Sequence, residues 1–143
     1  MICIYYLIYV LIKNNFNYYI IIMGKIIAYC REGCKYSIET SNTLTKLKKK
    51  YNIDIISVVN DENIKNNLKE ELKEIIGDHN TFPIILYETS KQKLYLIGGN
   101  QDLQNIILLL DKVNSKEEII NLSISDIHKR VLYYMFKNKI NII

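Results

Sequence analysis

The stretch Lys25-Ile26-Ile27-Ala28-Tyr29-Cys30-Arg31-Glu32-Gly33-Cys34-Lys35-Tyr36-Ser37 decides the fold of this 143-residue chain. Its first six residues form a short, mostly apolar run, which predicts a buried strand. Arg31-Glu32-Gly33 breaks the strand, and residues 34–50 then carry apolar side chains at helical spacing. Cys34 therefore stands where a strand turns into a helix. A thiol there meets the positive end of the helix dipole and free backbone N–H groups, so we expect a reactive thiolate.

The same patterns predict the order β-α-β-α-β-β-α for residues 25–110. Beyond the first strand and helix, we expect a β-branched strand at 53–59, an amphipathic helix over 64–76 closed by Gly77, a hairpin of strands at 83–87 and 93–97, and a helix at 101–110. Residues 115–136 predict one further helix with Ser125 as a candidate cap. Its expected apolar face carries Ile127, Val131 and either Tyr134 or Met135.

The composition limits the protein to one domain of a globular class. Hydrophobic residues make up 49% of the chain and charged residues 24%, which excludes disorder for most of it. Three cysteines are too few for a disulfide-stapled scaffold. The formal charge of +4 comes mostly from lysine, and no recognised motif accompanies it, so we expect no nucleic-acid partner.

Residues 1–23 form an apolar extension in which Lys13 separates two apolar runs. The first run, residues 1–12, is too short to cross a bilayer as a helix, and no signal-peptide cleavage site follows it. Three interpretations stay open. The extension is not translated and Met23 is the working start, or it is a weak membrane anchor, or it packs on the domain.

Three short motifs make residues 24–111 resemble the glutaredoxin family of the thioredoxin-like superfamily. Residues 31–37 are similar to the family's basic-x-x-Cys-Pro-Tyr-Cys active site, and Thr81-Phe82-Pro83 is similar to its Thr-Val-Pro loop with a cis proline. Residues 98–103, Gly-Gly-Asn-Gln-Asp-Leu, resemble its Gly-Gly-x-x-Asp-Leu motif. The resemblance implies an α/β thioredoxin-like fold, a four-stranded mixed sheet flanked by helices, here with an extra C-terminal helix. The implied division is an extension at 1–23, a glutaredoxin domain at 24–112 and a helical extension at 113–143.

The resemblance also implies roles for particular residues. Cys34 would be the catalytic nucleophile, and glutathione would be the co-substrate. The implied glutathione-binding residues are Arg31, Tyr36, Thr81, Phe82, Pro83, Gly99, Gln101 and Asp102. Arg31 would pair with a carboxylate of glutathione, and Phe82 would exchange backbone hydrogen bonds with its cysteinyl part. Two alternatives stay open, because Tyr36 can be a helix-facing aromatic residue and Asp102 can be a helix cap only.

The chain departs from the family pattern beside the nucleophile. Lys35 replaces proline and Ser37 replaces the second cysteine, so a monothiol mechanism is implied. Cys30 is a candidate resolving thiol, although a small apolar residue at a strand end is the simpler reading. His79 and His128 are expected to be solvated surface residues. The chain itself carries no metal motif.

We therefore expect a glutathione-dependent thiol–disulfide oxidoreductase that reduces protein–glutathione mixed disulfides. Glutathionylated or disulfide-containing proteins would be its partners, and a reducing compartment, the cytoplasm, its location. Two alternatives belong to other classes. One is a carrier or sensor of an iron–sulfur cluster ligated by glutathione, and the other is a thioredoxin-fold binding module with little turnover.

Overall fold

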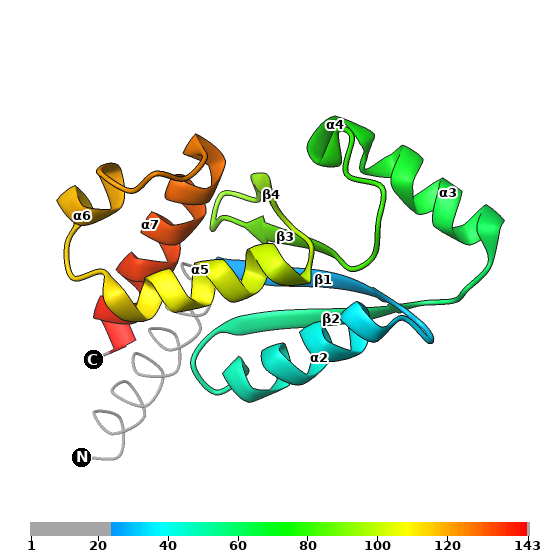
Figure 1. Cartoon of the computed structure of the whole chain (residues 1–143), viewed down its shortest axis with the longest axis horizontal. Helices are drawn as coiled ribbons and strands as arrows, with labels where there is room; N and C mark the ends of the chain where they lie inside the picture. Colours follow the sequence, from blue (N-terminus) through cyan, green and yellow to red (C-terminus); the bar gives the residue numbers. More distant parts are fainter. Residues whose placement is uncertain (1–23, 143) are drawn as a thin grey trace, which may run out of the picture.

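The computed structural model describes residues 24–142, with side chains as far as Asn138. Its elements follow one another in the predicted order as far as the third long helix (Figure 1). They are β1 (Lys25–Arg31), α2 (Lys35–Leu47), β2 (Asn52–Val58), α3 (Glu62–Glu71), α4 (Lys73–Ile76), β3 (Ile84–Glu88), β4 (Leu94–Gly98), α5 (Asn100–Lys112), α6 (Lys116–Ile120) and α7 (Asp126–Ile142).

The four strands form one mixed sheet in the order β2-β1-β3-β4. β1 pairs in parallel with β2 and antiparallel with β3, and β4 completes an antiparallel hairpin with β3. The parallel pair is joined through α2, as a crossover connection requires. This is the thioredoxin-like arrangement predicted from the sequence. It places β1 in the middle of the sheet, so the segment that leaves β1 emerges at the centre of one sheet end.

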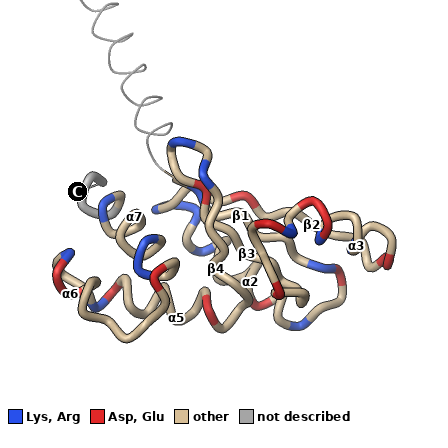
Figure 2. Tube along the Cα trace, turned by 90° about the horizontal axis from the view of Figure 1, so that it is seen from above, with Lys and Arg blue, Asp and Glu red and all other residues tan. Residues whose placement is uncertain are grey.

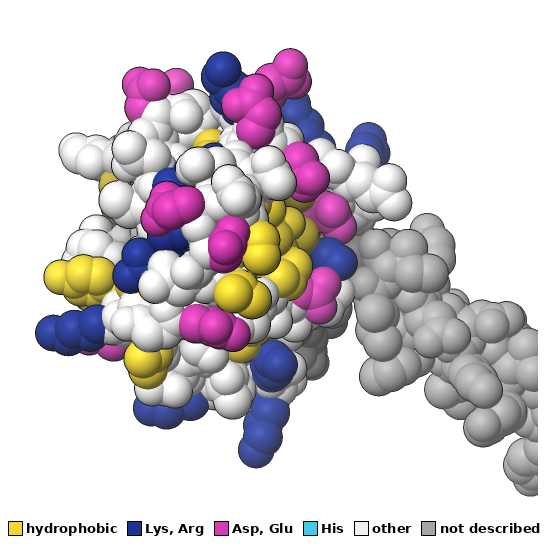
Figure 3. Space-filling model, turned by 90° about the vertical axis from the view of Figure 1, so that its right-hand side faces the viewer, with side chains coloured by type: hydrophobic (Ala, Val, Ile, Leu, Met, Phe, Trp, Pro, Cys, Tyr) yellow, Lys and Arg dark blue, Asp and Glu magenta, His cyan; other side chains and the backbone are white. Residues whose placement is uncertain are grey.

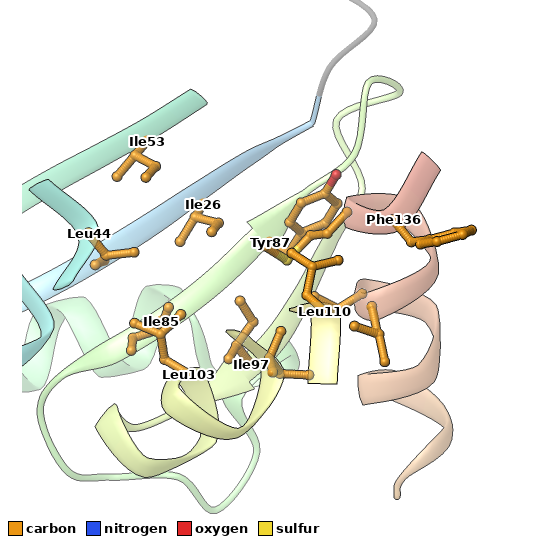
Figure 4. Close-up of a cluster of buried hydrophobic side chains, with 14 of the residues drawn as sticks. Ile26, Leu44, Ile53, Ile85, Tyr87, Ile97, Leu103, Leu110 and Phe136 are labelled. Carbon is orange, nitrogen blue, oxygen red and sulfur yellow. The ribbon is translucent and has the colours of Figure 1, made fainter. Parts of the chain in front are cut away.

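Alternation along β1 divides the core between the two faces of the sheet. The buried side chains form a larger and a smaller hydrophobic cluster. Ile26, Ala28 and Cys30 belong to the larger one. Ile27 belongs to the smaller one, together with Leu72, Ile76 and Phe82. Figure 4 shows the larger cluster, in which Ile26, Leu44, Ile85 and Leu103 come from a sheet and from the two helices that cover it.

The C-terminal segment differs from the single helix predicted over residues 115–136. It forms two helices, α6 and α7, and Ser115 and Ser125 each accept a hydrogen bond from a backbone N–H at the start of one of them. Because the second serine supplies a separate cap, the chain can stop after α6 and restart in a new direction. The predicted cap at Ser125 is confirmed. Ile127 was expected inward but is 46% exposed.

α7 packs on the same core as the sheet. Val131, Leu132 and Met135 are each 0% exposed and belong to the larger cluster with Leu103. α7 therefore packs against α5 and β4 (Figure 1). No helix among residues 24–142 is both long enough and apolar enough to cross a membrane.

The helix predicted over residues 64–76 is also interrupted. α3 ends at Glu71 and α4 restarts after Leu72, whose backbone lies at φ −95° and ψ 1°. Leu72 and Ile76 are buried as predicted, whereas Ile64 is 47% exposed. Gly77 ends α4 with φ 54°, so the expected glycine stop is confirmed.

Candidate active site

The turn between β1 and α2 places Cys34 at the start of the helix. Gly33 has φ 71°, a conformation that side chains with a Cβ adopt rarely, and it turns the chain after Arg31. Cys34 is the N-cap residue of α2, with φ −91° and ψ 121°. Its carbonyl accepts the first helical hydrogen bond, from Ile38 at 3.0 Å. The sulfur thus lies beside the free N–H groups of the first turn, as the sequence predicted.

Hydrogen bonds set the charge state of the Cys34 sulfur. Burial raises the pKa of Cys34, but hydrogen bonds from the Ser37 amide, the Ser37 hydroxyl and the Tyr36 amide lower it, and so does the charge of Arg31. The net effect holds the pKa below that of an ordinary thiol. The side chain is 8% exposed, so the sulfur is largely sheltered from solvent, and it lines the hollow described below.

Ser37 connects Cys34 to the end of β1. Its hydroxyl oxygen accepts a hydrogen bond from the Arg31 N–H at 3.0 Å, which leaves the hydroxyl proton for the Cys34 sulfur. Ser37 is 2% exposed. A serine at this position therefore holds the loop in place and stabilises the thiolate at the same time.

The loop before β3 forms the wall opposite Cys34. The Phe82–Pro83 peptide bond is cis, as the resemblance implied. The Phe82 carbonyl oxygen lies 3.7 Å from the Cys34 sulfur and accepts its proton when the group is a thiol. Phe82 is 9% exposed and Thr81 is exposed. The loop therefore brings the backbone of Phe82 next to the sulfur.

The start of α5 lines the same hollow as Cys34 and the Phe82 loop. Gly98 has φ 125°, and a Cβ on it would run into the Asp102 carboxylate. Asp102 accepts a hydrogen bond from the Gly99 N–H at 2.9 Å, so it caps the helix. Gln101 donates along the helix to Asn105 at 3.1 Å. The first helical hydrogen bond here is donated by Leu103, so the earlier amides of α5 have no helical acceptor.

A hollow of about 570 Å³ connects these three segments. Eight of the predicted site residues line it together with Cys34: Arg31, Tyr36, Thr81, Phe82, Pro83, Gly99, Gln101 and Asp102. Tyr36 is 58% exposed and stands at the rim. The three motifs, distant in sequence, thus surround one space beside the sulfur.

Sequence reasoning missed two lysines in this hollow. Lys65 and Lys69 lie four residues apart on α3 and both line it. Lys65 is 7% exposed, and its Nζ donates to Asn60 at 3.1 Å and to Glu62 at 2.6 Å. The Lys69 Nζ lies 5.5 Å from the centre of the Phe82 ring. The sequence did contain one signal for these lysines. Lys65 and Lys69 are four residues apart, so they share a face of the helix, and that face adjoins the buried side that carries Leu68 and Leu72.

The charges are distributed unevenly around the hollow. Arg31, Lys65 and Lys69 supply cations from β1 and α3, and Asp102 supplies a carboxylate from α5. The Arg31 Nε is buried and has no hydrogen-bond acceptor among the described residues. Arg31 itself lines the hollow, and a guanidinium binds carboxylates well.

Both histidines are more buried than predicted, and each lies within hydrogen-bond distance of a backbone carbonyl oxygen. His79 is half-buried, lines the hollow, and has Nε2 3.3 Å from the Pro83 carbonyl oxygen. His128 is half-buried, with Nε2 2.6 Å from the Ile97 carbonyl oxygen. The expectation of solvated histidines was wrong, because each ring has a backbone acceptor: Pro83 in the same loop for His79, and Ile97 in β4 for His128.

Cys30 lies on the other face of β1 from Arg31. It is 8% exposed and belongs to the larger core cluster. Burial, with a smaller contribution from Cys34, raises the pKa of Cys30 to about 11. The Cys30 side chain is therefore a neutral thiol at physiological pH.

Polar contacts join α2, the helix that begins at Cys34, to α5. Thr40 is 0% exposed and donates to Asn100 Oδ1 at 2.8 Å. Asn100 Nδ2 donates to Glu39 at 2.9 Å, and Gln104 donates to Thr43 at 3.0 Å. These bonds hold the start of α5 in register with α2.

No protein-family model matches this chain, and neither does any curated protein. Among solved structures, the chain is similar to a glutaredoxin 1 from Francisella tularensis complexed with cacodylate. The identity is 18%, the TM-score is 0.49, and the match covers 63% of this chain and 99% of that one. It is also similar to a thioredoxin-fold protein from Helicobacter pylori, at 15% identity and a TM-score of 0.42, covering 85% of this chain and 87% of that one. At such values the strand order of the chain itself, described above, remains the basis of the fold assignment.

Proposed function

We propose that this protein is a glutathione-dependent thiol–disulfide oxidoreductase of the glutaredoxin kind, with Cys34 as its nucleophile. The observation that carries this proposal is the Cys34 sulfur itself. It has a lowered pKa at a helix start and lies 3.7 Å from a carbonyl that precedes a cis proline. Thiolates at such positions are the attacking groups in disulfide exchange.

Glutathione would lie extended in the hollow beside this sulfur. Its cysteinyl part would pair with the Phe82 backbone in the way that an added strand pairs with a sheet edge. The Arg31 guanidinium would take its glycine carboxylate, with Lys69 on the same side. At the other end, the free amides of α5 would hold the γ-glutamyl carboxylate and Asp102 the amine. Tyr36, Thr81, Pro83, Gly99 and Gln101 complete the proposed surroundings.

The reaction would use two exchange steps that balance. In the first, the Cys34 thiolate attacks the glutathione sulfur of a mixed disulfide, so a Cys34–glutathione disulfide forms and the substrate protein leaves as a thiolate. In the second, a glutathione thiolate attacks the glutathione sulfur of that disulfide. Glutathione disulfide forms, and the electron pair of the broken bond returns to the Cys34 sulfur. The net reaction releases the substrate protein as a thiol and consumes one glutathione, and the other half of the glutathione disulfide comes from the mixed disulfide.

A monothiol route fits the side chains near the sulfur. Ser37 occupies the place of the second cysteine and cannot form a disulfide. Cys30 would be the other intramolecular thiol, but its pKa of about 11 leaves little thiolate for an attack. A second glutathione is the resolving thiol in this proposal, and Cys30 is a core residue.

Turnover with a glutathionylated peptide, coupled to glutathione disulfide reductase, tests the proposal. Cys34→Ser is expected to abolish turnover, and Cys30→Ser, the matched control four residues away, is expected to keep it. Retained turnover in Cys34→Ser would refute the nucleophile, and lost turnover in Cys30→Ser with an intact fold would refute the monothiol route. Visible absorbance after reconstitution with iron, sulfide and glutathione, together with absent turnover, would favour the cluster carrier instead.

A further inference from the structure

One side chain of the loop before β3 is drawn in against the fold. Residues 77–81 form this loop, which connects α4 to the cis-proline segment (Figure 1). Four of these five described residues are exposed, and His79 alone is half-buried. The imidazole takes no part in the exchange chemistry proposed above. Its inward position therefore needs another explanation.

His79 forms hydrogen bonds at both ends of the loop. Its backbone N–H donates to the Ile76 carbonyl oxygen at 3.0 Å, which fixes its main chain to the end of α4. Its Nε2 lies 3.3 Å from the Pro83 carbonyl oxygen. A carbonyl oxygen only accepts hydrogen bonds, so Nε2 is the protonated nitrogen and the donor in this contact. By contrast, the amides of residues 80–82 donate to no backbone carbonyl that the structure describes.

The imidazole therefore closes the loop around the segment that lies beside the sulfur. The Phe82 carbonyl oxygen is 3.7 Å from the Cys34 sulfur, and Phe82 is joined to Pro83 by the cis bond. A donor that holds the Pro83 carbonyl limits how far the Phe82 backbone can move. Since the amides of the loop have no backbone acceptor, this side-chain bond is an important restraint on it.

The same ring lies against the start of α5. A Cβ on Gly99 would stand 3.7 Å from the His79 Cε1, which is an ordinary van der Waals distance. It would stand 4.0 Å from the Asp102 carboxylate, which accepts the Gly99 N–H at 2.9 Å. His79 thus adjoins the capped end of α5, and one ring contacts both the cis-proline loop and this helix start.

His79 and Asp102 also separate two hollows. Both line the hollow of about 570 Å³ beside Cys34, and both line a second hollow of about 430 Å³ between α4, β4 and the start of α7. The imidazole is therefore part of the partition behind the cis-proline loop. A smaller side chain at position 79 would remove the support that the loop has on this side.

Charge does not account for the position of His79. None of the ion pairs between described residues includes it. Figure 2 shows Lys and Arg as well as Asp and Glu along the trace, and Figure 3, which views the α3 side, shows acidic side chains at the border of an apolar patch. Hydrogen bonding and packing are the interactions that place the ring.

We propose that His79 is a positioning residue for glutathione. Its ring holds the cis-proline loop against the start of α5 and so sets the separation between the Phe82 backbone and the first amides of that helix. These are two anchors of the proposed glutathione site, so the inference rests on the proposed function. The ring acts through Pro83 and Gly99. It therefore governs how well glutathione is held and leaves the chemistry of the sulfur to Cys34.

The stability of the mixed disulfide between Cys34 and glutathione tests this inference. The full chain, carrying Cys3→Ser and Cys30→Ser, is equilibrated with glutathione and glutathione disulfide, and mass spectrometry gives the glutathionylated fraction. In this equilibrium, the Cys34 thiol and glutathione disulfide give the mixed disulfide and one glutathione thiol. A parallel series uses 2-mercaptoethanol and its disulfide, which react with the same sulfur but carry no carboxylate or peptide group. The ratio of the two equilibrium constants measures recognition of glutathione.

His79→Ala is expected to lower the glutathione constant about 3- to 10-fold, the effect of one lost hydrogen bond between neutral groups, and to leave the mercaptoethanol constant unchanged. His79→Gln should recover most of the loss, because its amide nitrogen lies as many bonds from Cα as the histidine Nε2. His79→Asn is one bond shorter and should behave like His79→Ala.

His128→Ala is the matched control. His128 is also half-buried, its Nε2 lies 2.6 Å from the Ile97 carbonyl oxygen, and it lines only the second of the two hollows. This variant should keep both constants of its parent. Circular dichroism verifies that each variant folds, and if His79→Ala does not, the comparison of His79→Gln with His79→Asn decides.

Three results would overturn the inference. They are an equal loss in both constants for His79→Ala, an unchanged glutathione constant, and a His79→Gln protein no better than His79→Asn. Failure of the proposed function would look different. The parent protein would then form the mercaptoethanol disulfide but no glutathione disulfide, and the inference would fall with its premise.

Discussion

Replacing Ser37 by alanine tests how the thiolate of Cys34 is stabilised. The Ser37 hydroxyl donates to the Cys34 sulfur and accepts from the Arg31 N–H at 3.0 Å. A hydrogen bond to a charged acceptor contributes about 1.5–3 kcal/mol. Its loss should therefore disfavour the thiolate about 10-fold or more, and the pKa of Cys34 should rise toward that of an ordinary thiol. The Arg31 N–H would lose its acceptor too, which costs about 1–3 kcal/mol of stability.

The direction of the pH dependence follows from the sign of the shift. The pKa of Cys34 is lower in the folded protein than in the unfolded chain. The native thiolate therefore stabilises the fold above the unfolded-state pKa, and this contribution is lost as the pH falls through the native pKa. Ser37→Ala reduces that contribution. Alkylation of Cys34 should consequently need a higher pH to reach its plateau.

The assay is the rate of alkylation by iodoacetamide as a function of pH, in a background that carries Cys3→Ser and Cys30→Ser. At neutral pH the Ser37→Ala rate should fall about 3- to 10-fold, because the loss of thiolate exceeds the gain in its intrinsic nucleophilicity. At high pH both proteins are fully thiolate, and the variant should react faster than its parent because a thiolate of higher pKa is the stronger nucleophile. Ser41→Ala, one helical turn further on, is the control and should leave both limits unchanged. An unchanged profile in a folded Ser37→Ala protein would refute the role of the hydroxyl.

Three further predictions concern the backbone, the core and the second thiol. Gly98→Ala should destabilise the protein by more than about 1 kcal/mol and raise the KM for glutathione, since φ is 125° and the new Cβ displaces the carboxylate that caps α5. Gly33→Ala is the control, because Gly33 has φ 71° but open space around it, so its substitution should cost only backbone strain and leave the KM for glutathione unchanged. If both variants changed the unfolding free energy and the KM equally, the prediction would be contradicted. Leu132→Ala should cost about 2–5 kcal/mol in denaturant unfolding because Leu132 is 0% exposed, whereas Ile127→Ala, at 46% exposed, should cost little. Similar midpoints for these two variants would mean that α7 does not share the core. Cys30, with a pKa of about 11, should resist alkylation in the native protein at neutral pH and react after unfolding, and fast native labelling would contradict its burial.

Local signals in the sequence identified the elements that carry the site. The Cys34 turn, the single proline and the glycine pair at 98–99 each have a strong local preference, and each lies where it was expected. Periodicity located α2 and α5, but it did not assign every side chain to the core. Leu44, Leu103 and Ile106 are buried, whereas Ile38 on α2 is 54% exposed and Leu108 on α5 is 56% exposed. Periodicity failed at Leu72 and after Ile120, where a helix stops without proline or glycine and restarts in another direction.

The polar side chains of the site were harder to predict. Lys65 and Lys69 look like solvated helix residues in the sequence, and only the approach of α3 to the cis-proline loop brings them into the hollow. His128 gains a backbone acceptor from Ile97, 31 residues earlier in the chain, whereas the acceptor of His79 is Pro83 in the same loop. Ser37 was read as a missing cysteine, and its contact with Arg31 depends on how closely the helix start returns to β1.

By itself, the sequence determined the order of the strands and the long helices as far as α5, the position of Cys34 at a helix start and the short segments that surround it. These depend on preferences of neighbouring residues, which act wherever the chain goes. Only the tertiary structure decided which charges face the sulfur, that α7 completes the core, and that His79 lies between the cis-proline loop and the start of α5. Those features depend on contacts between residues far apart in sequence, and burial and long-range charge arise only once the sheet has formed.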